Sequence, residues 1–242
     1  MTHLPSVVLS GHGDACSVEV PPLREGEVHL WEADLQSDFL EGAHLLSEDE
    51  SRRATEMTDS ASQRRFIAAR VFLRCFLGTY LEEDPASLTF TYSPQGRPLL
   101  PASPHLHFSL ARTLDTALLG VSLHPLGVDM EPHSRADQAL AVARRFLSVD
   151  ERKDLSLLSP QERPSAALRA WVRKEAWLKA RGEGVFRGMT DLSVWIGEEV
   201  VPVTDDTDSP WSIIDVSAVA GGVIAVAVAC HTPVVVGPQV QI

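Results

Sequence analysis

Two acidic residues at the end of one apolar stretch are the first candidates for chemistry. Asp129 and Glu131 stand in the segment Gly127-Val-Asp-Met-Glu131, and residues two apart in a β-strand point to the same side. Paired carboxylate oxygens are hard ligands that suit Mg²⁺, which also keeps water and binds substrate phosphates. Taken alone, such a pair is more often a solvated acidic strand end. The motif therefore predicts a divalent-cation site only in combination with others.

A second group of charged residues has helical spacing. Glu175 and Lys179 lie four residues apart in Trp171-Val-Arg-Lys-Glu-Ala-Trp-Leu-Lys179, which places them on one helix face. In isolation such a pair is most often a surface ion pair. Lysine is rare here, however, since only 3 of the 21 basic residues are lysines and two of them fall in this segment. Lysine, unlike arginine, has a pKa that its surroundings can shift for proton transfer.

Strands and helices must bring these two groups together, and the hydrophobic periodicity predicts which elements do so. Ser47 followed by Glu50 is typical of a helix N-terminus, and residues 93–98 are rich in turn-forming types. We expect helices over about 63–81, 136–147, a short stretch from about 150, and 168–179. We expect strands over 28–34, 88–92, 107–110, 117–122, 126–130, 192–196, 211–216 and 223–230.

The order of these elements predicts an α+β fold with two similar halves. Each half has a long helix followed by about three strands. We therefore expect a pseudo-dimer in which each half combines one long helix with a three-stranded antiparallel sheet. The halves would comprise residues 1–124 and 125–242, the second carrying the metal and catalytic motifs, with the site in the cleft between them.

Composition limits the classes of partner. The chain has 242 residues, with 21 basic against 33 acidic ones and a formal net charge of −12. This charge argues against binding to nucleic acid or to an anionic membrane. Three widely spaced cysteines without a C-x-x-C pattern argue against a disulfide framework. The N-terminus has no signal-peptide pattern, and no apolar stretch approaches the ~18 residues of a membrane helix. We expect a cytoplasmic monomer.

In combination, these motifs resemble one family. They are similar to the 4′-phosphopantetheinyl transferases of the Sfp type, the double-length, pseudo-dimeric class, and the resemblance runs from about residue 28 to residue 230. The matching segments are Gly127-Val-Asp-Met-Glu131, Trp171 to Lys179, Gly182-x-Gly184, Arg65-Phe-Ile-Ala-Ala-Arg70, Gly96-Arg97-Pro98 and Phe146-Leu-Ser-Val-Asp-Glu151.

The resemblance implies transfer of the phosphopantetheine arm of coenzyme A to a serine of an apo acyl or peptidyl carrier protein, with release of 3′,5′-ADP. It implies Mg²⁺, with Mn²⁺ as an alternative, held by Asp129, Glu131 and Glu175. Either Glu175, or Glu151 through a water, would take the serine proton, and Lys179 would act on the leaving-group side. The implied coenzyme A ligands are Arg53, Gly96, Arg97, Pro98, Ala111, Arg112, Asp129, Lys174 and Lys179.

One segment departs from the family pattern. The strand before the junction usually reads F-N-x-S-H-S, whereas here Ala111 and Arg112 stand for the serine and the histidine. Arginine offers a permanent charge and a two-pronged donor suited to phosphate, so we expect Arg112 to replace the missing pair at the pyrophosphate. The departure keeps open one alternative, a degenerate relative that binds coenzyme A or a carrier without turnover. A second alternative is a Mg²⁺-dependent phosphohydrolase that uses the same carboxylates on another phosphate ester.

Overall fold

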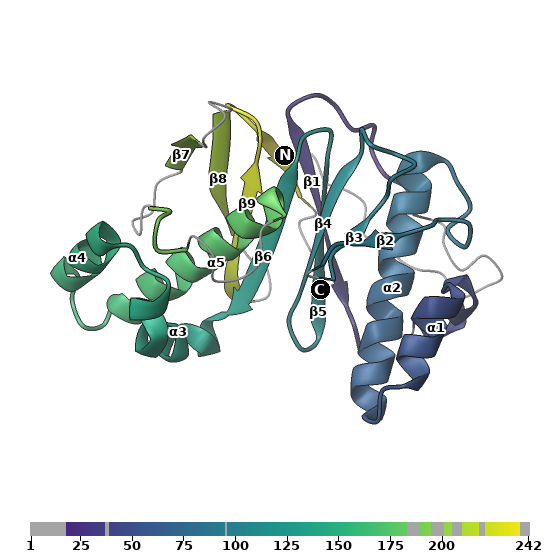
Figure 1. Ribbon diagram of the computed structural model, residues 1–242, viewed down its shortest axis with the longest axis horizontal. Helices are drawn as coiled ribbons and strands as arrows, with labels where there is room; N and C mark the ends of the chain where they lie inside the picture. Colours follow the sequence, from purple (N-terminus) through teal and green to yellow (C-terminus); the bar gives the residue numbers. More distant parts are fainter. Residues whose placement is uncertain are drawn as a thin grey trace.

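A computed structural model describes residues 18–36, 39–94, 96–182, 189–194, 201–204, 210–217 and 221–237 (Figure 1). The helices are α1 (Glu48–Thr55), α2 (Ser60–Leu81), α3 (Ala136–Val142), α4 (Val149–Leu157) and α5 (Arg163–Arg181), with 3₁₀ turns η1 (Leu40–Leu45), η2 (His133–Arg135) and η3 (Ala143–Arg145). The strands are β1 (Glu27–Asp34), β2 (Thr91–Tyr92), β3 (Pro98–Leu99), β4 (His107–Arg112), β5 (Thr116–Ser122), β6 (Leu126–Pro132), β7 (Val201–Thr204), β8 (Pro210–Ser217), β9 (Gly222–Val228) and β10 (Val234–Val236).

Two mixed α+β halves lie side by side, as Figure 1 shows. In the described part of the chain, the first sheet has the strand order β10-β1-β5-β4 and the second has the order β6-β9-β8-β7. The expectation of three strands in each sheet is therefore wrong. The second sheet gains β7 at its edge, and the first gains β10, which pairs in parallel with β1 and so brings residues 234–236 back to the first half.

Four layers of structure result from strands that are apolar on both faces. In β9, Ala225 and Ala227 pack toward α5, whereas Val226 and Val228 pack against the first sheet. Leu30 of β1 belongs to that same inter-sheet cluster. Period-two alternation with both faces apolar is what a strand needs when it is covered on both sides. The order of layers is thus α2, first sheet, second sheet and α5.

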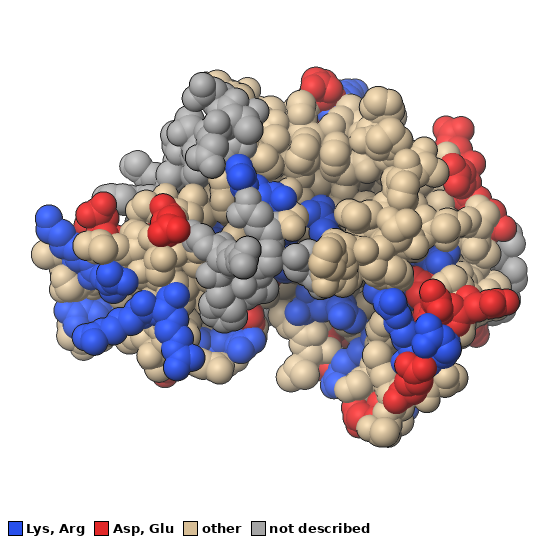
Figure 2. Space-filling view, in the orientation of Figure 1, with Lys and Arg blue, Asp and Glu red and all other residues tan. Residues whose placement is uncertain are grey.

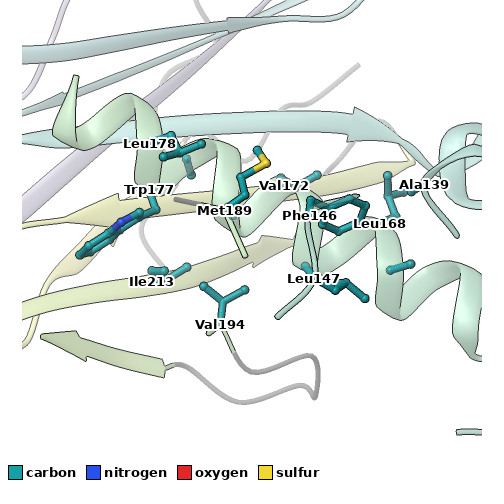
Figure 3. Close-up of a cluster of buried hydrophobic side chains, with 14 of the residues drawn as sticks. Ala139, Phe146, Leu147, Leu168, Val172, Trp177, Leu178, Met189, Val194 and Ile213 are labelled. Atoms are coloured by element: carbon teal, nitrogen blue, oxygen red, sulfur yellow. The ribbon is translucent and has the colours of Figure 1, made fainter. Parts of the chain in front are cut away.

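The core of the second half forms between α5 and its sheet (Figure 3). Val172, Trp177 and Leu178 of α5 pack there with Phe146 and Ile213. The start of α5 is set by a proline in its first turn, and Gly182 ends it with a positive φ of 70°. A rigid, buried α5 therefore carries both Glu175 and Lys179.

Local signals in the sequence located most helices correctly. Ser47 and Glu50 form the predicted capping box of α1, and Ser148 and Glu151 form another at α4. The expected helix over 136–147 is broken into α3 and the 3₁₀ turn η3. The strand expected over 88–92 is reduced to β2, and residues 192–194 form no strand, while residues 195 and 196 lie outside the described ranges.

Two further observations concern the sequence expectations. Among the described residues, no helix is long and apolar enough to cross a membrane. Cys75, buried in α2, is disulfide-bonded, whereas Cys230 is a free thiol. The cysteine spacing gave no sign of this disulfide.

Candidate active site

A cleft of about 260 Å³ receives side chains from both halves. Helix α2 and strand β4 of the first half line one side, and the C-terminal part of α5 lines the other. The turn between β2 and β3 contributes Gly96, Arg97 and Pro98. The polar and charged side chains of the lining are Arg70, Ser93, Arg97, Ser109, Arg112, Glu175 and Lys179.

The close approach of α5 to β6 brings Lys179 to the acidic strand. A Cβ atom at Gly127 would stand 2.0 Å from the carbonyl oxygen of Ala176 and 2.4 Å from the amide nitrogen of Ala180, so only glycine fits there. Because of this contact, Lys179 Nζ donates a hydrogen bond of 2.6 Å to Asp129 Oδ1 and one of 3.2 Å to the carbonyl oxygen of Val128.

Three carboxylates act on one another at this point. Burial, and then repulsion from Asp129, raises the pKa of Glu175 to about 7, while Lys179 opposes the rise. Burial likewise raises the pKa of Asp129 despite the attraction of Lys179. The pKa of Glu131 is raised by burial and by Asp129, although Arg135 donates a 2.9 Å hydrogen bond to it. Burial is thus the largest cause at each carboxyl, and repulsion from a neighbouring carboxylate adds to the rise at Glu131 and Glu175.

The expected metal ligands do not form a finished metal site. Among the described residues, no three His, Cys, Asp or Glu side chains are arranged to hold a metal ion. Lys179 pairs with Asp129, and Arg135 pairs with Glu131. The donor set nevertheless fits a hard divalent cation, because it offers only carboxylate oxygens whose mutual repulsion such a cation would relieve.

Arginines of the first half concentrate positive charge in the cleft. Arg70 is only 9% exposed, and its Nη1 atom has no hydrogen-bond partner. Its nearest carboxylate, Glu50, lies 3.8 Å away and is held instead by Arg74 at 2.7 Å. Burial and then repulsion from Arg70 lower the pKa of the Arg112 guanidinium. One buried carboxylate thus serves two arginines, and the surplus positive charge is left for an anion.

The Gly96-Arg97-Pro98 turn faces the same cleft, but its arginine also has a structural role. Gly96 has a φ of +80°, which permits the tight turn closed by hydrogen bonds from the amide of Gly96 to Ser93 and from Ser93 to Arg97. The Arg97 guanidinium donates to the carbonyl oxygens of Phe108 and Lys179, joining the two halves. Its Nε atom is buried without a partner.

Arg53 lies near this turn but is not part of the cleft lining. Its guanidinium stacks over the ring of Tyr92 in β2, 4.4 Å from the ring centroid. Arg70 approaches the same ring at 5.6 Å. The aromatic ring therefore positions two cations next to each other, as cation–π contacts do.

Two expected site residues are placed elsewhere. Lys174 is fully buried, donates to the carbonyl oxygens of Phe146 and Met189, and pairs with Glu151 at 2.7 Å. Glu151 is 1% exposed and accepts further hydrogen bonds from the amides of Ser148 and Val194. Both groups are saturated inside the core, and this geometry favours structural roles for Lys174 and Glu151 over those of a phosphate ligand and a base.

The two residues that depart from the family pattern lie in different places, one in the core and one in the cleft. Ala111 is buried between the two sheets, whereas the neighbouring Arg112 lies on the cleft wall.

Arg70 is a cleft residue to which the sequence analysis gave little weight. Its signal was its place four residues before Arg74 on α2, which puts both on one helix face. Gly184, part of a matching motif, lies outside the described residues.

Comparison with known proteins places these features in a wider group. Residues 125–227 match the model of the 4′-phosphopantetheinyl transferase superfamily. The 4′-phosphopantetheinyl transferase HetI of Nostoc is 32% identical over 86% of this chain and 90% of its own length. AcpT of Salmonella typhimurium is 31% identical over 72% of this chain and 80% of its own length. Sfp of Bacillus subtilis is 23% identical over 64% of this chain and 68% of its own length.

Proposed function

Since the chain belongs to the 4′-phosphopantetheinyl transferase superfamily, we infer that it transfers the 4′-phosphopantetheine arm of coenzyme A to a serine of an apo carrier protein. The released product is 3′,5′-ADP. The observation that supports the residue assignment is the cleft itself, where Arg70 and Arg97, each with a nitrogen that has no hydrogen-bond partner, line the same cavity as Glu175. Coenzyme A has phosphates for the arginines, and its pyrophosphate is the group that must be brought to the carboxylates.

Coenzyme A binding would divide between the two sides of the cleft. On the first half, Arg70 and Arg112 would bind phosphate oxygens by charge-assisted hydrogen bonds, as guanidinium groups do well. Gly96, Arg97 and Pro98 would border the nucleotide. Arg53, stacked on Tyr92, would extend the positive surface beyond the cleft lining.

On the second half, Asp129, Glu131 and Glu175 would hold Mg²⁺, with Lys179 and Arg135 moving off their carboxylates. When bound, the ion would neutralise negative charge on the pyrophosphate. The serine oxygen forms a bond to the phosphorus of the pantetheine side, and the bond from that phosphorus to the oxygen of 3′,5′-ADP breaks. Glu175 would accept the serine proton through a carboxylate oxygen that does not bind the ion. Lys179 would stabilise the departing phosphate.

The architecture supports the interpretation of the chain as a pseudo-dimer. We propose that the two α+β halves, each a long helix on a four-stranded sheet, are related units joined near residues 124–127. The segment containing β10 would belong with the first unit, because it pairs with β1. A site between the units would use residues that neither unit supplies alone.

Intact-mass measurement tests this function. Apo acyl and peptidyl carrier proteins are incubated with the chain, coenzyme A and Mg²⁺, and the carrier should gain one phosphopantetheine arm. Asp129→Ala should abolish the gain, with circular dichroism confirming that the variant is folded. No mass gain on any carrier would support a binding-only protein, and breakdown of coenzyme A without a carrier would support a hydrolase.

A further inference from the structure

The side chain of Arg97 connects the turn between β2 and β3 to three other elements. Its Nη2 atom donates hydrogen bonds to the carbonyl oxygens of Phe108 in β4, at 2.8 Å, and of Leu126 in β6, at 3.3 Å. Its Nη1 atom donates to the carbonyl oxygen of Lys179 in α5. Phe108 belongs to the first half, whereas Leu126 and Lys179 belong to the second. One guanidinium group therefore joins both halves at the cleft.

The hydrogen bond to Lys179 occupies a carbonyl group that α5 leaves without a regular helical partner. The last four carbonyl groups of a helix lack such partners, and α5 ends at Arg181 with Gly182 as its C-cap. The Lys179 carbonyl oxygen accepts a 3.2 Å hydrogen bond from the Gly182 amide and a second one from Arg97. The negative end of the helix dipole also favours a cation here. Arg97 thus fixes the last turn of α5, which carries the Lys179 side chain to Asp129.

Carbonyl oxygens, and no carboxylate, hold Arg97 in this place. Within the described ranges its guanidinium forms no ion pair, and only its Nε atom lacks a partner. Burial lowers the pKa of this guanidinium, and Figure 2 shows further Lys and Arg side chains on both sides of the hollow between the halves. Both Nη atoms of Arg97 are therefore engaged by the protein, whereas Arg70 leaves its Nη1 atom for an anion.

We propose that Arg97 is a positioning residue for the transfer reaction, which rests on the proposed function: its side chain holds the Lys179 backbone so that the Lys179 ammonium group reaches the departing phosphate. The turn that carries Arg97 is itself closed by two hydrogen bonds with Ser93, of 2.9 and 3.1 Å. A nucleotide bordering this turn and the helix that carries Lys179 are thereby kept at a fixed distance. Such a distance matters, because a displacement of about 1 Å can cost about 100-fold in rate.

Steady-state kinetics with coenzyme A and an apo acyl carrier protein tests this role. Arg97→Met removes the hydrogen-bond donors but keeps a long side chain, so kcat should fall about 10- to 100-fold while the KM for coenzyme A stays within about threefold. Arg97→Lys keeps donors for the carbonyl oxygens and should recover kcat to within about fivefold of the parent. A higher KM for coenzyme A with an unchanged kcat would make the side chain a coenzyme A ligand and overturn the proposal.

A double-mutant cycle shows whether Arg97 acts through Lys179. In the Lys179→Ala background, Arg97→Met should lower kcat by less than about twofold, because the group that Arg97 positions is already absent. The same fold-loss in both backgrounds would show that the two side chains act independently, which contradicts the proposal.

NMR of the protein labelled with ¹³C-lysine gives a second readout that needs no transfer activity. The chain has three lysines, so the ε-carbon signals of Lys153, Lys174 and Lys179 are assigned by substituting each in turn. Arg97→Met should shift the Lys179 signal and leave the Lys153 signal in place. An unmoved Lys179 signal in the folded variant overturns the proposal. If the parent transfers no arm to the carrier, the proposed function fails, whereas this spectrum still decides whether Arg97 positions Lys179.

The matched control lies at the other end of the same helix. Arg163 also donates to two carbonyl oxygens, those of Ser156 at 2.9 Å and Leu158 at 3.1 Å. Arg163→Met should lower the Tm, as Arg97→Met does, but leave kcat within about twofold of the parent and the Lys179 signal unmoved. An equal loss of kcat in Arg163→Met would mean that general loosening of α5 is the cause, and the positioning role would be wrong.

Discussion

Glu175 is buried, which favours its neutral form, although the proposed function requires its carboxylate. Its carboxyl is buried near Asp129 and Glu131, and its pKa rises to about 7 from an ordinary value of 4.5. The folded protein therefore binds this proton more tightly than the unfolded chain does. As pH increases from about 4.5 to about 7, the unfolded chain loses the proton first and stability declines. Above pH 7 the full cost of the buried charge is present.

Replacing Glu175 by Gln should stabilise the metal-free protein. The amide stays neutral, so at pH 8 the variant should gain up to about 3 kcal/mol in unfolding free energy, whereas near pH 4.5 it should match the parent. Urea denaturation in the presence of a chelator measures both values. Added Mg²⁺ should stabilise the parent more than the variant, which should have lost phosphopantetheine transfer. A variant less stable than the parent at pH 8 would show that Glu175 is not under repulsion.

The arginines on the opposite wall allow a second prediction. Arg112→Ala and Arg70→Ala should each lower kcat/KM for coenzyme A by about 1–3 kcal/mol, roughly 5- to 150-fold, because each removes a charged hydrogen-bond donor to phosphate. Arg112→His should lose activity more than the parent as the pH rises from about 6 to 8, since only histidine discharges there. Testing dephospho-coenzyme A alongside shows which phosphate is bound. Parental kcat/KM in Arg112→Ala would remove that residue from the site.

At the scale of single elements, close packing of β6 on α5 sets the site geometry. Gly127→Ala places a methyl group against the backbone at Ala176 and Ala180, which cannot yield as a side chain can. Overpacking of this kind should cost about 3 kcal/mol and lower the Tm by about 6–12 °C. Gly237→Ala, where a Cβ meets nothing within 4 Å, is the control. Thermal denaturation that left both variants unchanged would mean that α5 sits farther from β6.

Lys174 tests whether a motif residue acts in the core or in the cleft. Lys174→Ala should destabilise the protein by about 3–5 kcal/mol, because it leaves Glu151 buried without its cation. The double variant Lys174→Met/Glu151→Gln removes both charges and should recover much of that loss. Measured by steady-state kinetics, its kcat/KM for coenzyme A should stay within about threefold of the parent. A hundredfold drop in a folded double variant would restore the catalytic interpretation.

Helices and strands with strong local signals could be predicted from the sequence, whereas long-range strand pairing could not. Strong local signals such as the Ser47 capping box or the alternation in β1 predicted helices and strands correctly, since they depend only on neighbours in the chain. The pairing of β10 with β1 depends on residues about 200 positions apart, and nothing in three valines specifies such a partner. For the same reason, Lys174 and Lys179 look alike in sequence, although one faces the core and the other the cleft.

Across the whole molecule, net charge and local charge oppose each other. A chain with a formal net charge of −12 repels an acidic partner at long range, while exposed cations on its surface attract such a partner at short range. Salt screens both effects, so the two changes should largely cancel. We therefore expect the carrier KM to change less than about threefold between 50 and 300 mM NaCl, because docking would then depend mainly on local apolar contacts. Steady-state kinetics over this range measures it, with the KM for coenzyme A, which depends on unscreened phosphate contacts in the cleft, determined in parallel. A steep rise in carrier KM with salt would show that long-range attraction dominates the encounter.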